Sequence, residues 1–248
     1  DEFPKTITCT YDEKSQQQLD LVYPATASQS AVPVQIFFHG GYWSAMSREN
    51  FYFVARAFAD HGIATAIVDY ELIPIIHMAE LIRQCRQSVA YIYQNAEKLG
   101  LDNANIHVSG HSAGGHIAAM CLAANWSEFQ QGLPTQIVQS AVGISGLYDL
   151  EPISKCFLQK ELNLTNAEIQ AQSPVNLTQP ETGRMYQLVG AKEGPEYISQ
   201  SQDLATKWPD ISQSPDILEP YNHFTIMSAL ADPSSAPARL IRAAMEAT

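Results

Sequence analysis

Apolar residues along this chain follow two different spacings, which alternate from one end of the chain to the other. Short runs rich in β-branched and aromatic residues predict strands at 6–11, 19–23, 34–38, 63–69, 106–109, 137–145, 185–189 and 215–218. Apolar residues at three- and four-residue steps predict helices at 51–61, 80–99, 113–125, 165–172, 196–207 and 236–245. The clearest helix is 80–99, because Gly100 follows it and suits a left-handed C-cap.

Strands that alternate with helices in this way predict parallel crossover connections. We therefore expect an α/β fold with a mostly parallel, doubly wound, eight-stranded sheet and helices on both faces. Only a polar turn separates the first two strands, so these N-terminal strands are expected to be antiparallel. No internal repeat or linker-like composition interrupts the chain, which predicts a single domain over residues 1–248.

One segment, 106–116, combines an expected strand, a sharp turn and an expected helix around a serine. It contains the pattern Gly-x-Ser-x-Gly, with Ser112 at the centre and Gly110 and Gly114 on either side. A nucleophile elbow needs this context, because its turn is so tight that the flanking positions must be small. The segment predicts that Ser112 stands at a helix N-terminus, where the helix dipole favours developing negative charge.

A second segment, His-Gly-Gly-Tyr-Trp at 39–43, follows an earlier expected strand. Glycine tolerates positive φ, so such a turn can present backbone N–H groups outward. Gly40 and Gly41, together with the N–H of Ala113, are expected to form an oxyanion hole. His39 is expected to orient this turn through hydrogen bonds.

Two further groups of side chains near these motifs are open to more than one interpretation. The candidates for lining a substrate pocket are Tyr42, Trp43 and His111, although packing is an equal alternative for the two aromatic residues. The three closely spaced histidines His107, His111 and His116 suggest a metal site, but a strand–turn–helix would point them in different directions. We therefore expect no metal and no cofactor.

A serine nucleophile needs a base, and the base needs an orienting acid, in the chain order serine, acid, histidine. His223 is the only histidine after His116, so it is the expected base. Glu193 follows the strand expected at 185–189 and is the expected acid. The alternative acids are Glu196, then Asp203 and Asp216. Glu193 would hold the imidazole tautomer and stabilise the imidazolium.

The composition narrows the choice of partners. Asp and Glu number 26 against 14 Lys and Arg, for a net charge of −12. This balance repels phosphate backbones and anionic lipid surfaces, so neither nucleic acid nor a membrane is an expected partner. The four cysteines lack metal-ligand spacing and are expected to be small buried hydrophobes.

A cytoplasmic location is expected, since no signal peptide and no apolar run of membrane-spanning length are visible. The chain begins at Asp1 without Met, so a removed leader stays open. A homodimer is also left open. The expected partner is a small-molecule ester or formamide.

The motifs together resemble those of α/β-hydrolase esterases and lipases, and of kynurenine formamidases (arylformamidases) in particular. The resemblance rests on His-Gly-Gly-Tyr-Trp, Gly-His-Ser-Ala-Gly-Gly-His and the late Asn-His-Phe. It extends to further segments in the family's order, namely 18–24, 69–74, 145–150, 173–174 and 189–201. In the last segment the family's catalytic Asp falls on Glu193, which is one methylene longer.

The resemblance implies a serine hydrolase that acts on a small acyl ester or formamide through an acyl-enzyme, as kynurenine formamidases do. The absence of a long insertion predicts that no large lid covers the site. One alternative is a broad short-chain carboxylesterase with no role in tryptophan catabolism. A remote alternative is an inactive hydrolase fold that serves as a binding protein.

Overall fold

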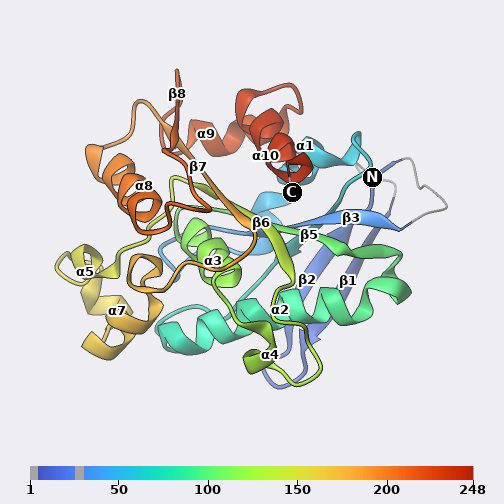
Figure 1. Ribbon diagram of the computed structural model, residues 1–248, viewed down its shortest axis with the longest axis horizontal. Helices are drawn as coiled ribbons and strands as arrows, with labels where there is room; N and C mark the ends of the chain where they lie inside the picture. Colours follow the sequence, from blue (N-terminus) through green and yellow to red (C-terminus); the bar gives the residue numbers. More distant parts are fainter. Residues whose placement is uncertain (1–4, 26–30, 248) are drawn as a thin grey trace.

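The computed structural model describes residues 5–25 and 31–247. Its centre is an eight-stranded sheet with the strand order β1-β2-β4-β3-β5-β6-β7-β8 (Figure 1). β2 runs antiparallel to both of its neighbours, and all other neighbouring strands are parallel. The strands are β1 Thr6–Asp12, β2 Gln17–Val22, β3 Val32–Phe38, β4 Ala64–Val68, β5 Leu101–His111, β6 Val138–Ile144, β7 Arg184–Gly190 and β8 Asp216–Leu218. The expected sheet with its antiparallel start is confirmed.

Helices cover both faces of this sheet (Figure 1). The longer ones are α2 Met78–Leu99, α3 Ala113–Leu122, α7 Asn166–Gln172, α8 Pro195–Lys207 and α10 Ala236–Glu246. The short ones are α1 Arg56–Ala59, α4 Trp126–Phe129, α5 Leu150–Ile153, α6 Gln159–Leu162 and α9 Thr225–Ser228. Three 3₁₀ helices complete the set within the described residues: η1 Arg48–Ala55, η2 Pro174–Asn176 and η3 Ala229–Ala231.

Successive residues of the central strands pack into two separate hydrophobic cores, one on each face of the sheet. On β3, Ile36 and Phe38 belong to the core that includes α2 and α3, whereas Phe37 belongs to the core that includes α1 and α10. On β4, Ala66 and Ile67 divide in the same way. Because successive side chains of a strand point to opposite faces, a continuous apolar run is what a sheet covered on both sides requires.

Two expectations from the sequence are wrong in part. Residues 51–61 do not form one α-helix, since η1 precedes the single turn of α1. The large buried residues of η1, Phe51 and Val54, lie three positions apart, which suits the three-residue turn of a 3₁₀ helix. Cys156 is exposed because it lies in the surface connection between α5 and α6, whereas the other three cysteines are buried.

The carboxyl ends of the parallel strands lie along one edge of the sheet, where ligands bind in open α/β sheets. The turn with Gly40 and Gly41 follows β3, and Ser112 follows β5. Glu193 follows β7, and His223 follows β8. This topology therefore brings four distant segments of the chain together. No helix within residues 5–25 and 31–247 is long and apolar enough to cross a membrane.

Candidate active site

Ser112 occupies a strained turn between β5 and α3. Its backbone angles, φ of 55° and ψ of −116°, lie outside the regions that residues other than glycine favour. Its N–H donates to the Ile144 carbonyl at 2.8 Å, which ties the turn to β6. A Cβ on Gly114 would lie 1.9 Å from the Phe38 oxygen, and one on Gly110 would lie 2.2 Å from the Gly114 backbone. The two glycines are therefore a steric requirement of this turn.

The turn after β3 supplies backbone groups beside Ser112. Gly41 has a φ of +108°, and its carbonyl accepts the N–H groups of Ser44 and Ala45 at 3.0 Å. Gly40 and Gly41 both line the cavity that contains Ser112. Ala113 is the first residue of α3, where backbone N–H groups have no intrahelical acceptor. Gly40, Gly41 and Ala113 therefore all lie beside Ser112.

His39 fixes the start of the same turn. Its Nδ1 donates to the Gly40 carbonyl at 2.7 Å, and its ring stacks on Tyr70 at 4.3 Å between centroids. The Tyr70 hydroxyl donates to the His39 carbonyl at 2.8 Å. Burial lowers the pKa of His39, so the ring is neutral at neutral pH. Its contacts are those of a residue that holds the turn in place.

Glu193 is the carboxylate that contacts His223. Its Oε2 lies 2.7 Å from His223 Nδ1, and its Oε1 accepts the Ser145 hydroxyl at 2.5 Å and the Gly190 N–H at 2.7 Å. Burial raises the pKa of the Glu193 carboxyl, but these three hydrogen bonds and the charge of His223 together outweigh burial and leave the pKa below its ordinary value. Because a carboxylate can only accept, His223 Nδ1 carries the proton and Nε2 is free to accept one.

The other candidate acids lie elsewhere. Glu196 is exposed in the first turn of α8, and the Asp203 carboxylate accepts a hydrogen bond from Ser199 on the same helix. Asp216 opens the edge strand β8 and is exposed. Ser145, in contrast, is a partner of Glu193 that the sequence reasoning missed. It belongs to the Ser-Gly-Leu-Tyr-Asp segment that carried part of the family resemblance, and this was the only signal that could have found it.

The three histidines of segment 106–116 bind three different partners. His107 contacts Ser140 Oγ and Asn105 Oδ1, whereas His116 Nε2 donates to the Gln172 carbonyl at 2.6 Å. His111 Nε2 donates to the His223 carbonyl at 2.8 Å. Burial lowers the pKa of His107 to about 4, of His111 to about 3 and of His116 to about 4. No group of metal-ligating side chains is found in residues 5–25 and 31–247.

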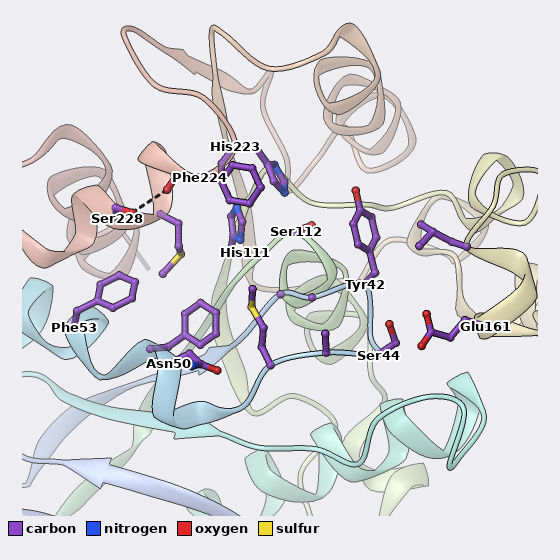
Figure 2. Close-up of a pocket in the computed structure, with 17 residues that line it drawn as sticks. Tyr42, Ser44, Asn50, Phe53, His111, Ser112, Glu161, His223, Phe224 and Ser228 are labelled. Carbon is purple, nitrogen blue, oxygen red and sulfur yellow. Dashed lines mark hydrogen bonds between the residues drawn. The ribbon is translucent and has the colours of Figure 1, made fainter.

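A cavity of about 620 Å³ opens in front of Ser112, and both Ser112 and His223 line it. Figure 2 shows Asn50 and Phe53 toward one end of this cavity and Tyr42, Ser44 and Glu161 toward the other. The remaining apolar lining, which the sequence reasoning did not place, includes Met46, Phe51, Leu158, Phe224 and Met227. These residues come from η1, from near α6 and α9, and from the loops beside them, so only the folded chain brings them together.

Tyr42 and Trp43 face opposite ways. Tyr42 lines the cavity, and its hydroxyl lies 3.2 Å from that of Tyr197, whose ring lies 4.4 Å from that of His223 between centroids. Trp43 is fully buried in the core, where its indole N–H donates to His116 Nδ1 at 3.2 Å. The expectation that Trp43 lines the pocket is therefore wrong. Both residues have positive φ, and this tight turn sends consecutive side chains in different directions.

A serine on a strand–helix turn lies at the carboxyl edge of the sheet, together with a histidine and its carboxylate. This arrangement, on this strand order, defines a hydrolase of the α/β-hydrolase fold. The chain belongs to the BD-FAE family, whose model matches residues 19–207.

Similar sequences and a similar solved structure support this class. The kynurenine formamidase of Salmo salar is 30% identical over 91% of this chain and 77% of its own length. The kynurenine formamidase of Danio rerio is 28% identical over 90% of this chain and 75% of its own length. A solved structure from Silicibacter sp. TM1040, described as a putative thioesterase, superposes with a TM-score of 0.82. It is 27% identical and covers 96% of this chain and 86% of that one.

Proposed function

We propose that this protein hydrolyses a small acyl ester or formamide through an acyl-enzyme on Ser112, in the manner of a kynurenine formamidase. The observation that carries the proposal is the 2.7 Å hydrogen bond between Glu193 and His223 at the cavity that Ser112 lines. The similarity to named kynurenine formamidases over most of the chain supports the same reaction class.

In the proposed mechanism, His223 Nε2 takes the proton from Ser112 Oγ as Oγ forms a bond to the acyl carbon. The negative charge that develops on the acyl oxygen is met by the N–H groups of Gly40, Gly41 and Ala113. The bond to the leaving oxygen or nitrogen then breaks, and His223 returns the proton to the leaving group. Water, activated by the same imidazole, releases the acyl group from Ser112. The carboxylate beside His223 stabilises the imidazolium during both the acylation and the deacylation of Ser112.

The size and the lining of the cavity suit a small substrate with an apolar or aromatic part. Its volume of about 620 Å³ lies within the range of small-molecule sites, roughly 300–1,000 Å³. Phe51, Phe53 and Met227 line one part of it. A short-chain carboxylesterase would use the same groups and is the main alternative. An inactive binding protein would not need the complete Glu193–His223 pair, which argues against that alternative.

The test is the ratio of kcat/KM for N-formyl-L-kynurenine to kcat/KM for p-nitrophenyl acetate on one preparation. Activated esters are easy substrates, so a formamide value equal to or above the ester value would support formamidase chemistry. Ester turnover without formamide turnover would replace it with the carboxylesterase. If a fluorophosphonate probe failed to label Ser112, hydrolysis through this serine would be wrong.

Two expectations about the protein's setting stay predictions. A cytoplasmic location is tested by fractionation of the source cells. A homodimer is tested by light scattering of the purified chain.

A further inference from the structure

His111 makes a contact that the mechanism above does not use. It is the last residue of β5 and directly precedes Ser112. Its Nε2 lies 2.8 Å from the backbone oxygen of His223, and the two rings lie 4.5 Å apart between centroids. One side chain therefore joins the turn of the proposed nucleophile to the main chain of the proposed base.

The chemistry of this contact is fixed by its acceptor. A carbonyl can only accept, so His111 Nε2 carries the proton. Burial, with a smaller effect of positive charge on His223, lowers the pKa of His111 to about 3, although the bond to the His223 carbonyl and Glu193 act in the opposite direction. The His111 ring therefore stays neutral when His223 takes up a proton. It can hold the loop between β8 and α9, residues 219–224 (the histidine loop), without adding a second positive charge.

The sheet gives the histidine loop little support. His223 follows β8, an edge strand of three residues that pairs with β7 alone among the described strands. Asn222 stabilises the loop locally, since its Oδ1 accepts the N–H groups of Phe224 and Thr225. These bonds shape the loop but do not attach it to the Ser112 turn. The His111 hydrogen bond does attach it.

We propose that His111 is a positioning residue that holds the main chain of His223 at the distance from which its imidazole reaches Ser112. The proposal rests on the proposed function, because it assigns a task only if His223 is the base. His111 also lines the cavity, as expected from the sequence, so the proposal adds to that position a structural link between two parts of the catalytic machinery.

The experiment compares two substitutions of His111 with a control on the same strand. His111→Gln keeps an N–H donor close to the position of Nε2, whereas His111→Leu has similar bulk and no donor. The control is His107→Leu, because His107 is a buried histidine of β5 whose partners are Asn105 and Ser140 rather than the triad. For each variant, kcat and KM for p-nitrophenyl acetate are measured per fluorophosphonate-titrated site, together with the melting temperature.

We expect His111→Leu to lose about 10- to 100-fold in kcat, with little change in KM, since a His223 carbonyl without its donor no longer holds the loop in place. His111→Gln should recover most of this loss. His107→Leu should lower the melting temperature without lowering kcat per titrated site. The rate of fluorophosphonate labelling should fall with kcat, because labelling uses the same base.

Three results would overturn the proposal. One is a His111→Leu enzyme with wild-type kcat, and another is a His111→Gln enzyme as slow as His111→Leu. The third is an equal loss of kcat in His107→Leu, which would make the effect a general one of stability. Ser112→Ala separates these from failure of the proposed function, because activity that survives in Ser112→Ala would show that hydrolysis occurs elsewhere.

Discussion

The turn around Ser112 and the loop around His223 are held in place by different forces. Ser112 follows β5, which lies inside the sheet between β3 and β6, and the residue is 3% exposed. His223 follows the edge strand β8, and its neighbour Phe224 is 72% exposed. The serine turn is confined by backbone packing that leaves no room for a Cβ at Gly110 or Gly114. The histidine loop is held by hydrogen bonds, such as that from the Lys192 N–H to the Tyr221 carbonyl at 2.9 Å, and by the buried residue Ile226 of α9, which follows it.

This difference predicts how each region fails. One carbon added to a closely packed turn forces the backbone or the side chains to shift and destabilises the fold. A loop held by polar contacts tolerates added volume but moves when a donor or acceptor is removed. Added volume and removed hydrogen bonds should therefore affect the two regions differently.

The largest effect is expected at the proposed nucleophile. Ser112→Ala removes the attacking oxygen and should lower kcat by a factor on the order of 10⁶, if the triad acts as a unit. Steady-state ester hydrolysis measures this loss, and circular dichroism checks that the fold is intact. Activity close to that of the wild type would refute the assignment of Ser112.

The next largest effect is expected at the acid of the histidine loop. Glu193→Gln retains the shape but removes the charge and favours the wrong imidazole tautomer, so kcat should fall by about 10⁴-fold. Glu196→Gln is the matched control, because Glu196 is exposed on α8 and should change kcat by less than about twofold. If the two variants ranked in the reverse order, Glu196 would be the acid.

Added volume should damage the serine turn through stability rather than chemistry. A Cβ on Gly114 would lie 1.9 Å from the Phe38 oxygen, so Gly114→Ala should cost more than about 4 kcal/mol of unfolding free energy or prevent folding. Gly100→Ala is the control, since Gly100 has a φ of +68° but a Cβ there would meet no atom within 4 Å. It should cost only about 1 kcal/mol. Urea denaturation compares the two, and equal costs would argue against steric confinement.

A smaller loss is expected where one of several hydrogen bonds to Glu193 is removed. Ser145→Ala deletes the 2.5 Å bond to Oε1 and should reduce kcat by about tenfold. The Gly190 N–H and His223 bonds remain. Ser140→Ala is the matched control, because Ser140 is buried on β6, the strand that leads to Ser145, but contacts His107. Equal activity of both variants would show that the Gly190 bond suffices.

The smallest effect concerns acid stability. Burial lowers the pKa of His107 to about 4, whereas an unfolded histidine titrates near 6.5. Between these values the unfolded chain binds a proton that the folded chain excludes, so stability falls as the pH drops from about 6.5 to 4. His107→Gln should reduce this slope by up to about 1.4 kcal/mol per pH unit. Urea denaturation at about pH 7, 6 and 5 gives the slope, and an unchanged slope would contradict a neutral buried His107.

Much of the fold could be predicted because its signals are local. The alternation of strands and helices needs only the spacing of apolar residues, and the eight strands appear where that spacing places them, although β5 begins five residues earlier than expected, at Leu101. The spacing of apolar residues does not predict the short helices α4, α5, α6 and α9. Each is a single turn of four residues, too short for a periodic pattern to develop.

The site divides in the same way. The turn around Ser112 and the turn at Gly40 and Gly41 could be predicted from sequence, because steric limits act between residues a few positions apart. The sequence by itself left the choice among Glu193 and its rivals open, placed Trp43 in the pocket as readily as in the core, and held no direct sign of Ser145. Those contacts join segments far apart in the chain. They depend on which strands become neighbours and where each strand ends, and only tertiary packing decides that.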